Sequence, residues 1–512
     1  MAYRDFQHFL ETLEQKGELR RISETVSPSL EITEISDRVM KAGGPALLFE
    51  NVVGCEPRLG TPDPDSAVMG HAPISVPAAG SRRYDMPVAI NTMGTRRRMS
   101  LALSCDDFEE HAQRIEALLK PELPKGPVEA LKMLGHLFGE LKGVRPSKVS
   151  SGKCQERVTL GDDVDLLQLP VLTCWPEDGG PFITLPLVFT HDPNTGKRNV
   201  GMYRIQIHDK RTCGMHWQMH KTGMRQMEDA GKKGKRLEAC IVLGSDPACI
   251  FSAIAPLPPG IDEMMFAGFL RREGVAMVKA KTVDMEVPAD AEIVIEGYVE
   301  PSERRLEGPF GDHTGYYSLA EPFPVLHVTA VTRREKPVYP ATIVGQPPME
   351  DGWMGKAVER IFLPLIRLSV PEIVDMNLPV ETCFHNAAFV SIKKKYPGHA
   401  YKVMNAIWGL GGLSFTKFVF IFDEECDVQN LQEALFRLGA NCDPMRDTLA
   451  NKGPVDQLDH ASVEEGFGGK LGFDCTHKWP GENGFTRQYP KLITMSDEIK
   501  RKIDSLWPRL GL

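Results

Sequence analysis

The feature that most constrains the fold is a stretch from about residue 154 to residue 345, in which short β-favouring runs alternate with turns and helices are few. Runs of this kind, bounded by Gly, Pro, Asn and Asp, are typical of strands. Strands are expected at residues 184–189, 200–207, 248–254, 275–281, 292–299 and 325–332, with one helix near 262–271. This pattern predicts a compact β-barrel with decorating helices.

The segment before this region has a mixed pattern. Helical spacing of apolar residues predicts a helix over 3–16, and residues 106–142 also look helical. Strand-like runs at 46–52 and 86–91 are separated by a loop rich in Pro, Gly and Ser at 60–83. The N-terminal part is therefore expected to combine helices and strands.

The pattern changes again after the middle region. A helix is expected over 353–368, broken or bent by its proline. Strands at 387–393 and 417–422 then alternate with helices at 399–408 and 430–438. This alternation indicates a separate α/β domain.

With 512 residues, the chain is too long for one hydrophobic core. The expected fold class is α+β. Its expected parts are an N-terminal α/β flanking region at 1–125, a split β-barrel domain at 126–345, a connecting helix at 346–375 and a C-terminal α/β domain at 376–512.

Composition argues against several classes of protein. A net charge of −9 and a pI of 5.9 argue against nucleic-acid binding, because neutralising phosphates needs surplus Lys and Arg. Eleven cysteines without a Cys-x-x-Cys pair favour reduced thiols in the cytoplasm. Acids interrupt the N-terminal apolar pattern, and Asp246 interrupts the most apolar stretch at 239–259, so neither a signal peptide nor a membrane span is expected.

Common catalytic signatures are missing from the sequence. There is no Gly-x-Ser-x-Gly, Walker or His-Glu-x-x-His motif. The glycines at 409–412 follow an expected helix and precede an expected strand, which is the wrong order for a dinucleotide-binding loop.

One acidic segment is more informative. Glu307 and Asp312 flank a Gly-Pro-Phe-Gly turn, and Tyr316 and Tyr317 follow. Two acids in a partly apolar pocket push their pKa values apart, so that one can hold a proton while the other pairs with a cation. The alternative is a solvated acidic turn, which the Gly and Pro content favours on composition alone.

Further segments in order along the chain extend this observation. They are Leu30 to Ile35, Gly43 to Asn51, Pro170 to Asp178, Asn199 to Arg204, Glu263 to Gly268, Glu307 to Tyr317, Asp443 to Asp447 and Lys478 to Glu482. With these segments the chain resembles the UbiD family of decarboxylases over nearly its whole length. The resemblance implies removal of CO2 from an aromatic or unsaturated acid, with prenylated flavin mononucleotide (prFMN) and a divalent metal as cofactors.

The resemblance also implies cofactor-binding residues. In the family a divalent metal, usually Mn2+, bridges the flavin phosphate to an Asn, a His and a Glu, which match Asn199, His220 and Glu263. Oxygen donors with one imidazole suit Mn2+ or Mg2+. The spacing alone would indicate an ordinary histidine and a helix-surface acid. The flavin is expected beside Met202, Tyr203, Arg204, His216, Trp217 and Lys221, and a K+ ion near the backbone of 252–255.

The family's catalytic residues match Arg204, Glu307 and Asp312. Loss of CO2 from an sp2 carbon leaves electrons in the ring plane, and a covalent adduct between substrate and flavin takes them up. The forked guanidinium of Arg204 can hold Glu307 and meet a substrate carboxylate. Asp312 would deliver the proton that replaces CO2, or first deprotonate a phenol. A cycloaddition and a quinonoid route both stay open.

Within the family the resemblance favours 4-hydroxy-3-polyprenylbenzoate of quinone biosynthesis as substrate. Alternatives are other aryl acids, such as a dihydroxynaphthoate of menaquinone synthesis, a hydroxybenzoate or a heteroaromatic acid. A catalytically silent flavin-binding scaffold and a flavin-independent metal hydrolase are alternatives of different classes. Asn441 stands where relatives commonly have Arg, so a phosphate or subunit contact of that Arg is in doubt.

The same resemblance implies partners and location. Expected partners are the aromatic acid, a flavin prenyltransferase that supplies the cofactor, and further copies of the chain, from dimer to hexamer, joined through a C-terminal oligomerisation domain. No nucleic acid is expected. The expected location is the cytoplasm, with peripheral contact to the inner membrane as an alternative, since a polyprenyl tail would lie in the bilayer.

Overall fold

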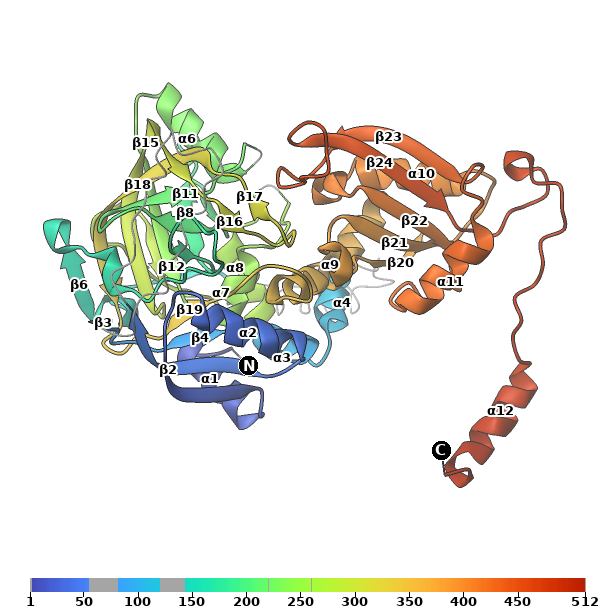
Figure 1. The fold of residues 1–512 in the computed structure, drawn as a ribbon, viewed down its shortest axis with the longest axis horizontal. Helices are drawn as coiled ribbons and strands as arrows, with labels where there is room; N and C mark the ends of the chain where they lie inside the picture. The colour runs from blue at the N-terminus through green and yellow to red at the C-terminus, as the bar shows by residue number, and fades with distance from the viewer. Residues whose placement is uncertain (1, 55–81, 120–142, 220, 259, 512) are drawn as a thin grey trace, which may run out of the picture.

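The computed structural model describes residues 2–54, 82–119, 143–219, 221–258 and 260–511. Three large sheets organise these residues (Figure 1). The expected loop at 60–83 and the later part of the expected helix at 106–142 lie mostly outside the described residues. The described part of that helix is α4 (Phe108–Leu119).

The N-terminal sheet combines strands from distant parts of the chain. Its members are β1 (Leu19–Val26), β2 (Ala46–Gly54), β3 (Arg82–Arg83), β4 (Val88–Ile90) and β19 (Tyr339–Ala341). The expected opening helix is confirmed as α1 (Phe6–Gln15), whose Phe6, Phe9, Leu10 and Leu13 are buried. Helices α2 (Glu31–Lys41) and α3 (Arg96–Ala102) complete this part.

A nine-stranded sheet forms the core domain. Its members are β6 (Arg157–Leu160), β7 (Phe182–Ile183), β8 (Leu187–His191), β9 (Arg198–Gly201), β10 (Ile205–Ile207), β11 (Thr212–Met215), β12 (Leu237–Leu243), β15 (Ile293–Glu307) and β18 (Glu321–Arg333). The strand order is β7-β10-β11-β18-β15-β12-β8-β9, with β6 paired to β18. Its named pairings are antiparallel, and the path stays open at β7 and β9 among the described residues.

Short elements decorate this sheet. They are β5 (Ser147–Val149), β13 (Ala276–Lys279), β14 (Glu286–Pro288), β16 (Phe310–Gly311), β17 (Tyr317–Ser318), α6 (Thr222–Lys232), α7 (Pro247–Ser252) and α8 (Glu263–Arg271). The long strands β15 and β18 form an antiparallel pair, in which Ile293 faces Arg333 at one end and Glu307 faces Glu321 at the other. The β16–β17 hairpin connects the two strands. The expected helix near 262–271 is confirmed as α8.

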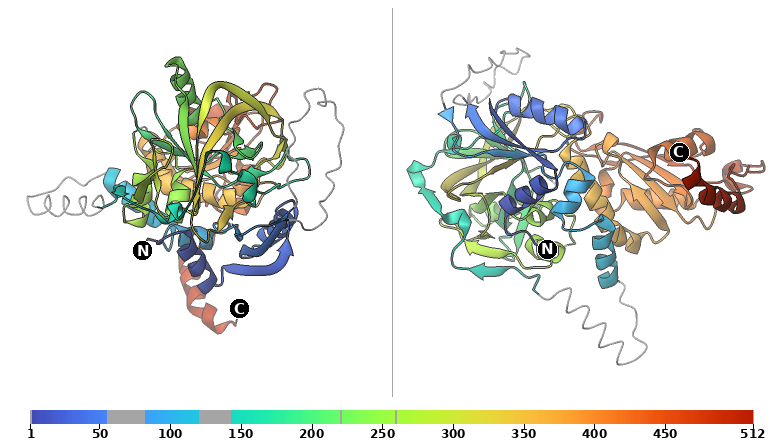
Figure 2. Two further views of the ribbon diagram at one scale, coloured as in Figure 1. Left: turned by 90° about the vertical axis from the view of Figure 1, so that its left-hand side faces the viewer. Right: turned by 90° about the horizontal axis from the view of Figure 1, so that it is seen from below.

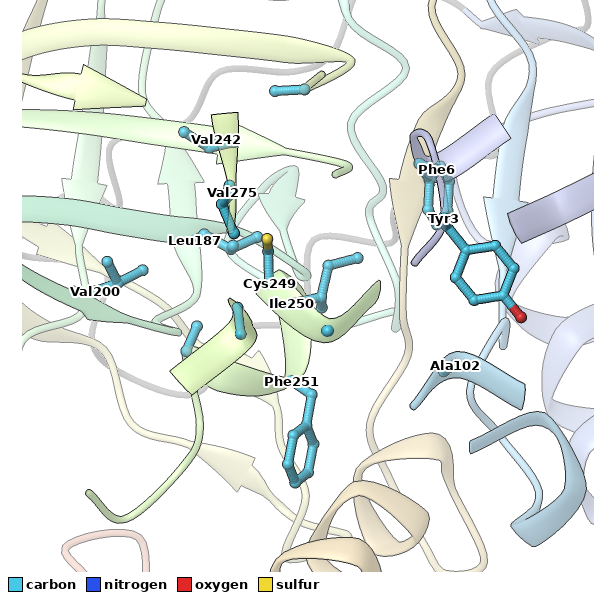
Figure 3. Close-up of a cluster of buried hydrophobic side chains, with 14 of the residues drawn as sticks. Tyr3, Phe6, Ala102, Leu187, Val200, Val242, Cys249, Ile250, Phe251 and Val275 are labelled. Atoms are coloured by element: carbon cyan, nitrogen blue, oxygen red, sulfur yellow. The ribbon is translucent and has the colours of Figure 1, made fainter. Parts of the chain in front are cut away.

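The strand expected at 248–254 is wrong, because most of this run is the helix α7. Asp246 caps it by accepting a hydrogen bond from the Ala248 amide, and Pro247 fits the first helical turn. Figure 3 shows Cys249, Ile250 and Phe251 within the apolar core. Every residue of α7 is buried, so its apolar run carries no periodicity that separates a helix from a buried strand.

The strand expected at 200–207 is also corrected. It is two strands, β9 and β10, separated by Met202–Arg204. These three residues leave the sheet, which frees their side chains and backbone for the site described below.

The C-terminal domain follows the helix α9 (Glu350–Ser369), which continues through Pro364 without a break. Its sheet has the order β20-β21-β22-β24-β23. The elements are β20 (Ile373–Asn377), β21 (Ala387–Ile392), α10 (His399–Trp408), β22 (Phe418–Asp423), α11 (Leu431–Asn441), β23 (Thr448–Pro454) and β24 (Phe467–Asp474). The expected βαβα series is confirmed, and three further strands, β20, β23 and β24, extend its sheet.

A last helix, α12 (Asp497–Leu506), lies apart from the other elements at the end of an extended segment (Figures 1 and 2). None of its residues is buried, and Ile499 and Ile503 are among its exposed apolar side chains. Within the described part of the chain, we find no helix of the length and hydropathy needed to cross a bilayer.

Candidate active site

Arg204 is the centre of a buried ionic cluster. It lies in the gap between β9 and β10, and its side chain reaches Glu307 at the end of β15. Its Nε donates to Glu307 Oε1 at 2.8 Å, and its Nη2 donates to Glu307 Oε2 at 3.2 Å. Two parallel bonds of this kind fix the plane of the guanidinium as well as its charge.

Asp312 contacts the same guanidinium from the β16–β17 turn. Nη1 of Arg204 donates to Asp312 Oδ2, and Nη2 also donates to Ser318 Oγ at 3.0 Å. Phe310 lies 4.8 Å from the guanidinium carbon, close enough for a cation–π contact. Gly311 lets this segment pack closely on Trp175, because a Cβ there would lie 2.2 Å from Cδ1 of Trp175.

The cluster keeps both acids charged. Burial would raise the pKa of Glu307, but the charge of Arg204 and the hydrogen bond from His216 outweigh it and lower the pKa to about 2. Burial acts in the same way on Asp312, and Arg204 and His313 hold its pKa well below the ordinary value. The reading as a solvated acidic turn is therefore wrong, since both side chains are buried.

His216 extends the cluster on the side of Glu307. Its Nδ1 lies 2.9 Å from Glu307 Oε2, while its Nε2 is buried and has no hydrogen-bond partner among the described residues. Burial, together with the charge of Arg204, lowers the pKa of His216. Because a buried orphan nitrogen is costly, this atom fits a polar ligand. Nε1 of Trp217 is another such orphan.

A cavity of about 210 Å³ opens beside Arg204 and brings many of the expected residues together. Its lining combines core-domain residues with two from the C-terminal domain: Thr184, Met202, Tyr203, Arg204, His216, Gln218, Lys221, Phe310, Asp312, His313, Val344, Asp456 and Leu458. Lys221 also stands at the N-terminus of α6, where helix amides and a lysine suit a phosphate group. The donors present therefore fit a flavin phosphate and ring.

The expected metal ligands are partly described. Glu263 begins α8, and its Oε2 accepts a hydrogen bond from the amide of Val200 at 3.2 Å, next to Asn199. Burial raises the pKa of Glu263 to about 7. A half-buried carboxylate is a ligand that suits a hard divalent cation. His220 lies outside the described residues.

Asp178 holds the backbone around the site in place, although no role was predicted for it from the sequence. Its Oδ1 accepts from the amide of Gly311 at 2.8 Å, and its Oδ2 accepts from the amides of Cys174 and Trp175 at 2.9 Å. It therefore ties the 170–178 segment to the turn before Asp312. Burial raises its pKa to about 7. The only signal for it was its place in a family-like segment.

Comparison with known proteins identifies the class of enzyme. Three family models of 3-octaprenyl-4-hydroxybenzoate carboxy-lyase domains match the chain. They cover residues 10–118 (N-terminal domain), 146–347 (Rift-related domain) and 352–475 (C-terminal domain). These matches, with structural neighbours that are decarboxylases, define a carboxy-lyase. The chain belongs to the UbiD family.

Individual relatives agree with this assignment. An uncharacterized protein of Aquifex aeolicus is 48% identical over 513 residues, covering 100% of this chain and 99% of its own. Vanillic acid decarboxylase of Sedimentibacter hydroxybenzoicus, in closed form, has a TM-score of 0.81 at 26% identity and covers 100% of both chains.

The UbiD-class enzyme HmfF of Pelotomaculum thermopropionicum is also similar. Its complex with FMN has a TM-score of 0.76 at 28% identity, covering 98% of this chain and 100% of HmfF. An evolved dimeric form of HmfF in complex with prFMN has a TM-score of 0.73 at 27% identity, covering 93% and 97%.

Proposed function

We propose that the protein removes CO2 from an aromatic carboxylic acid with prFMN as cofactor, and that Arg204, Glu307 and Asp312 are its catalytic residues. The observation that carries the proposal is the buried Arg204, held by two charged acids on one wall of the cavity. The complexes of HmfF with FMN and prFMN support the cofactor.

Each residue of the cluster has a defined task. Arg204 is fixed by Glu307, so its remaining donor capacity can orient a substrate carboxylate in the cavity. Glu307 keeps the guanidinium in place, and the His216 hydrogen bond keeps Glu307 in place. Asp312 lies at the cavity wall, where it can pass a proton to the carbon that loses CO2. Bound prFMN supplies an electrophilic carbon that accepts the electrons left by CO2.

The cofactor is proposed to lie along Met202, Tyr203, His216, Trp217 and Lys221. Asn199, His220 and Glu263 are proposed to hold Mn2+ or a similar ion against the flavin phosphate, with K+ near 252–255. Oxygen donors and one imidazole suit such an ion. A flavin prenyltransferase is the proposed source of the cofactor.

The substrate is proposed to be an aryl acid that carries a hydroxyl group. The likeness to vanillic acid decarboxylase supports this class, and 4-hydroxy-3-polyprenylbenzoate, which implies contact with a membrane surface, is one candidate within it. The test is CO2 release from purified enzyme with hydroxybenzoates, prenylated hydroxybenzoates and dihydroxynaphthoates. Release from one class names the substrate, whereas bound flavin without CO2 from any acid would favour a silent scaffold.

The protein is also proposed to assemble into a homo-oligomer through its C-terminal domain. The dimeric form of HmfF supports self-association. Exposed apolar side chains on both sides of α12, such as Ile493 before it and Trp507 directly after it, are suited to packing against a second copy.

A further inference from the structure

Both oxygens of Asp312 are occupied, which limits its use as a store of protons. Oδ2 accepts from Arg204, and Oδ1 accepts from the backbone amide of His313 at 2.7 Å and lies 2.8 Å from Nδ1 of the same residue. A carboxylate with these donors strongly favours its charged form. The proton that replaces CO2 therefore has to be held elsewhere until it is needed.

His313 is the group next to that carboxylate. Its Nδ1 must carry a hydrogen, because a lone pair facing a carboxylate oxygen would repel it. Its Nε2 lies 2.9 Å from Nε2 of His385, which precedes β21 in the C-terminal domain. Two ring nitrogens at this distance share one proton, so one imidazole donates and the other accepts.

The surrounding charges decide which ring donates. Asp312, Asp351 and Asp456 are the acids that face His313, whereas His385 faces Lys417 and His313 itself as well as Asp456 and Asp459. Although burial alone lowers the pKa of His313, its bond to Asp312 raises it to about 9. Burial and the charge of His313 lower the pKa of His385 to about 4. His313 is the charged donor and His385 the neutral acceptor.

We propose that His313 stores the proton that replaces CO2, that Asp312 passes it to the substrate, and that His385 holds His313 in its charged form. The inference rests on the proposed decarboxylation. The electron pair left when the C–C bond to the carboxylate breaks would be held by the bound flavin and then return to that carbon, where it forms the new C–H bond with a proton from Asp312. The Nδ1 proton of His313 moves to Asp312, which leaves His313 neutral. A solvent proton restores His313 after product leaves the cavity that it lines.

This proton store spans two domains. His313 lies in the β16–β17 turn of the core domain, and His385 and Asp456 belong to the C-terminal domain. His385 can accept the Nε2 hydrogen of His313 only while the two domains are packed together. Proton supply is thereby linked to the packing of the domains across the cavity.

A metal ion is the competing use of these side chains. Ligand atoms of His313, His385 and Asp456 lie within 4.8 Å of one another. Two imidazole nitrogens on a tetrahedral zinc, each about 2.0–2.1 Å from the ion, would lie about 3.3 Å apart. The observed 2.9 Å matches a shared proton instead.

The first arm of the test measures protonation without turnover. Flavin-free protein is labelled with 15N at histidine, and the signal of His313 is identified as the one that disappears in His313→Gln. In the wild type this signal is expected to show an imidazolium up to about pH 9. In His385→Leu the imidazolium is expected to persist only to a lower pH. A neutral His313 at pH 7 would overturn the proposal. The proposal would also be overturned if the wild type bound one equivalent of Zn2+ and His385→Leu bound none, because the two histidines would then form a metal site.

The second arm follows kcat against pH in the flavin-loaded enzyme. Since the charged form of His313 is lost as pH rises, kcat is expected to fall on the basic side. His385→Leu should move this fall to lower pH by about one unit, which lowers kcat about twofold at pH 8 and about fivefold at pH 9, with KM and flavin absorbance unchanged. His385→Gln, which keeps an acceptor oxygen, should restore most of the loss.

His460→Gln is the matched control, because the His460 ring packs on Tyr316 at 4.1 Å across the same pair of domains and lies outside the His313–His385 pair. It should follow the wild type. An unchanged basic limb in His385→Leu would overturn the proposal. Wild-type enzyme that binds flavin and releases no CO2 would instead refute the proposed function, while the first arm would still decide the charge of His313.

Discussion

Arg204 and Glu307 form a paired contact inside the core domain, in which Nε and Nη2 of the guanidinium donate to the two oxygens of one carboxylate at 2.8 and 3.2 Å. The residues are 103 positions apart and both are buried. Such a contact fixes an orientation that a single charge cannot fix.

Arg204→Lys should therefore lose activity while keeping a positive charge. An ammonium group cannot reach Glu307, Asp312 and a substrate carboxylate in one plane, and a misplaced substrate alone costs about 100-fold in rate. We expect kcat/KM for CO2 release to fall at least about 100-fold. Near-normal activity in this variant, with flavin bound, would contradict the role given to the guanidinium.

Asp312→Asn should separate binding from turnover. The amide keeps the shape of the side chain but cannot carry a proton to carbon, and general acids contribute about 100- to 10,000-fold. We expect kcat to fall about 1,000-fold with flavin absorbance retained. Loss of flavin together with activity would indicate a structural role instead.

Glu263→Gln should weaken the proposed metal site. Removing the carboxylate charge is expected to reduce Mn2+ affinity at least about tenfold and to lower flavin retention on dialysis. Glu273→Gln, an exposed acid just beyond the same helix, is the control and should bind Mn2+ as the wild type does. Metal content and absorbance after dialysis measure both effects, and equal retention by the two variants would argue against Glu263 as a ligand.

Asp5, which lies outside the proposed active site, should make the free energy of unfolding depend on pH. It caps α1 and accepts from Arg334 at 2.9 Å and from Lys153 at 3.0 Å. Burial raises its pKa, but these donors outweigh burial and lower the pKa from 3.8 to about 2. Because the folded value is depressed, the stabilisation is present above about pH 4 and is lost as pH falls towards 2.

The variant Asp5→Asn tests this dependence. It should lose about 2 kcal/mol at pH 7, because hydrogen bonds to charged groups are lost. Its unfolding temperature should also change less between pH 5 and pH 2.5 than that of the wild type. Parallel curves for the two proteins would show that Asp5 does not titrate as described.

Removal of residues 492–512 should change assembly more than folding. The segment and α12 bury no side chain against the rest of the chain. We expect an unfolding temperature of the shortened monomer within a few degrees of the full chain, and a smaller mass by light scattering. An unchanged mass would place the contact between copies elsewhere in the C-terminal domain.

Much of this fold was accessible from the sequence where periodicity was strong. Helices such as α1, α8 and α10 followed from apolar spacing and caps. The helix α7 was missed because its side chains are buried all round, which removes the amphipathic signal. The break between β9 and β10 was missed because nothing in 202–204 marks a turn.

The site was accessible only in part, for a related reason. Glu307 and Asp312 are close in sequence, so their segment could be singled out. His385, however, lies 72 positions from His313 in another domain, and no local sequence pattern predicts their contact. Long-range pairs of this kind depend on how the domains pack, which one sequence does not specify.

The most direct test of the central claim is CO2 release from a carboxyl-labelled hydroxybenzoate by two preparations of the same protein. One is purified anaerobically with Mn2+ from cells that co-express a flavin prenyltransferase, and the other from cells that lack it. We predict flavin absorbance and labelled CO2 in the first preparation only. Equal CO2 release from both, or no bound flavin in the first, would contradict a prFMN-dependent decarboxylase.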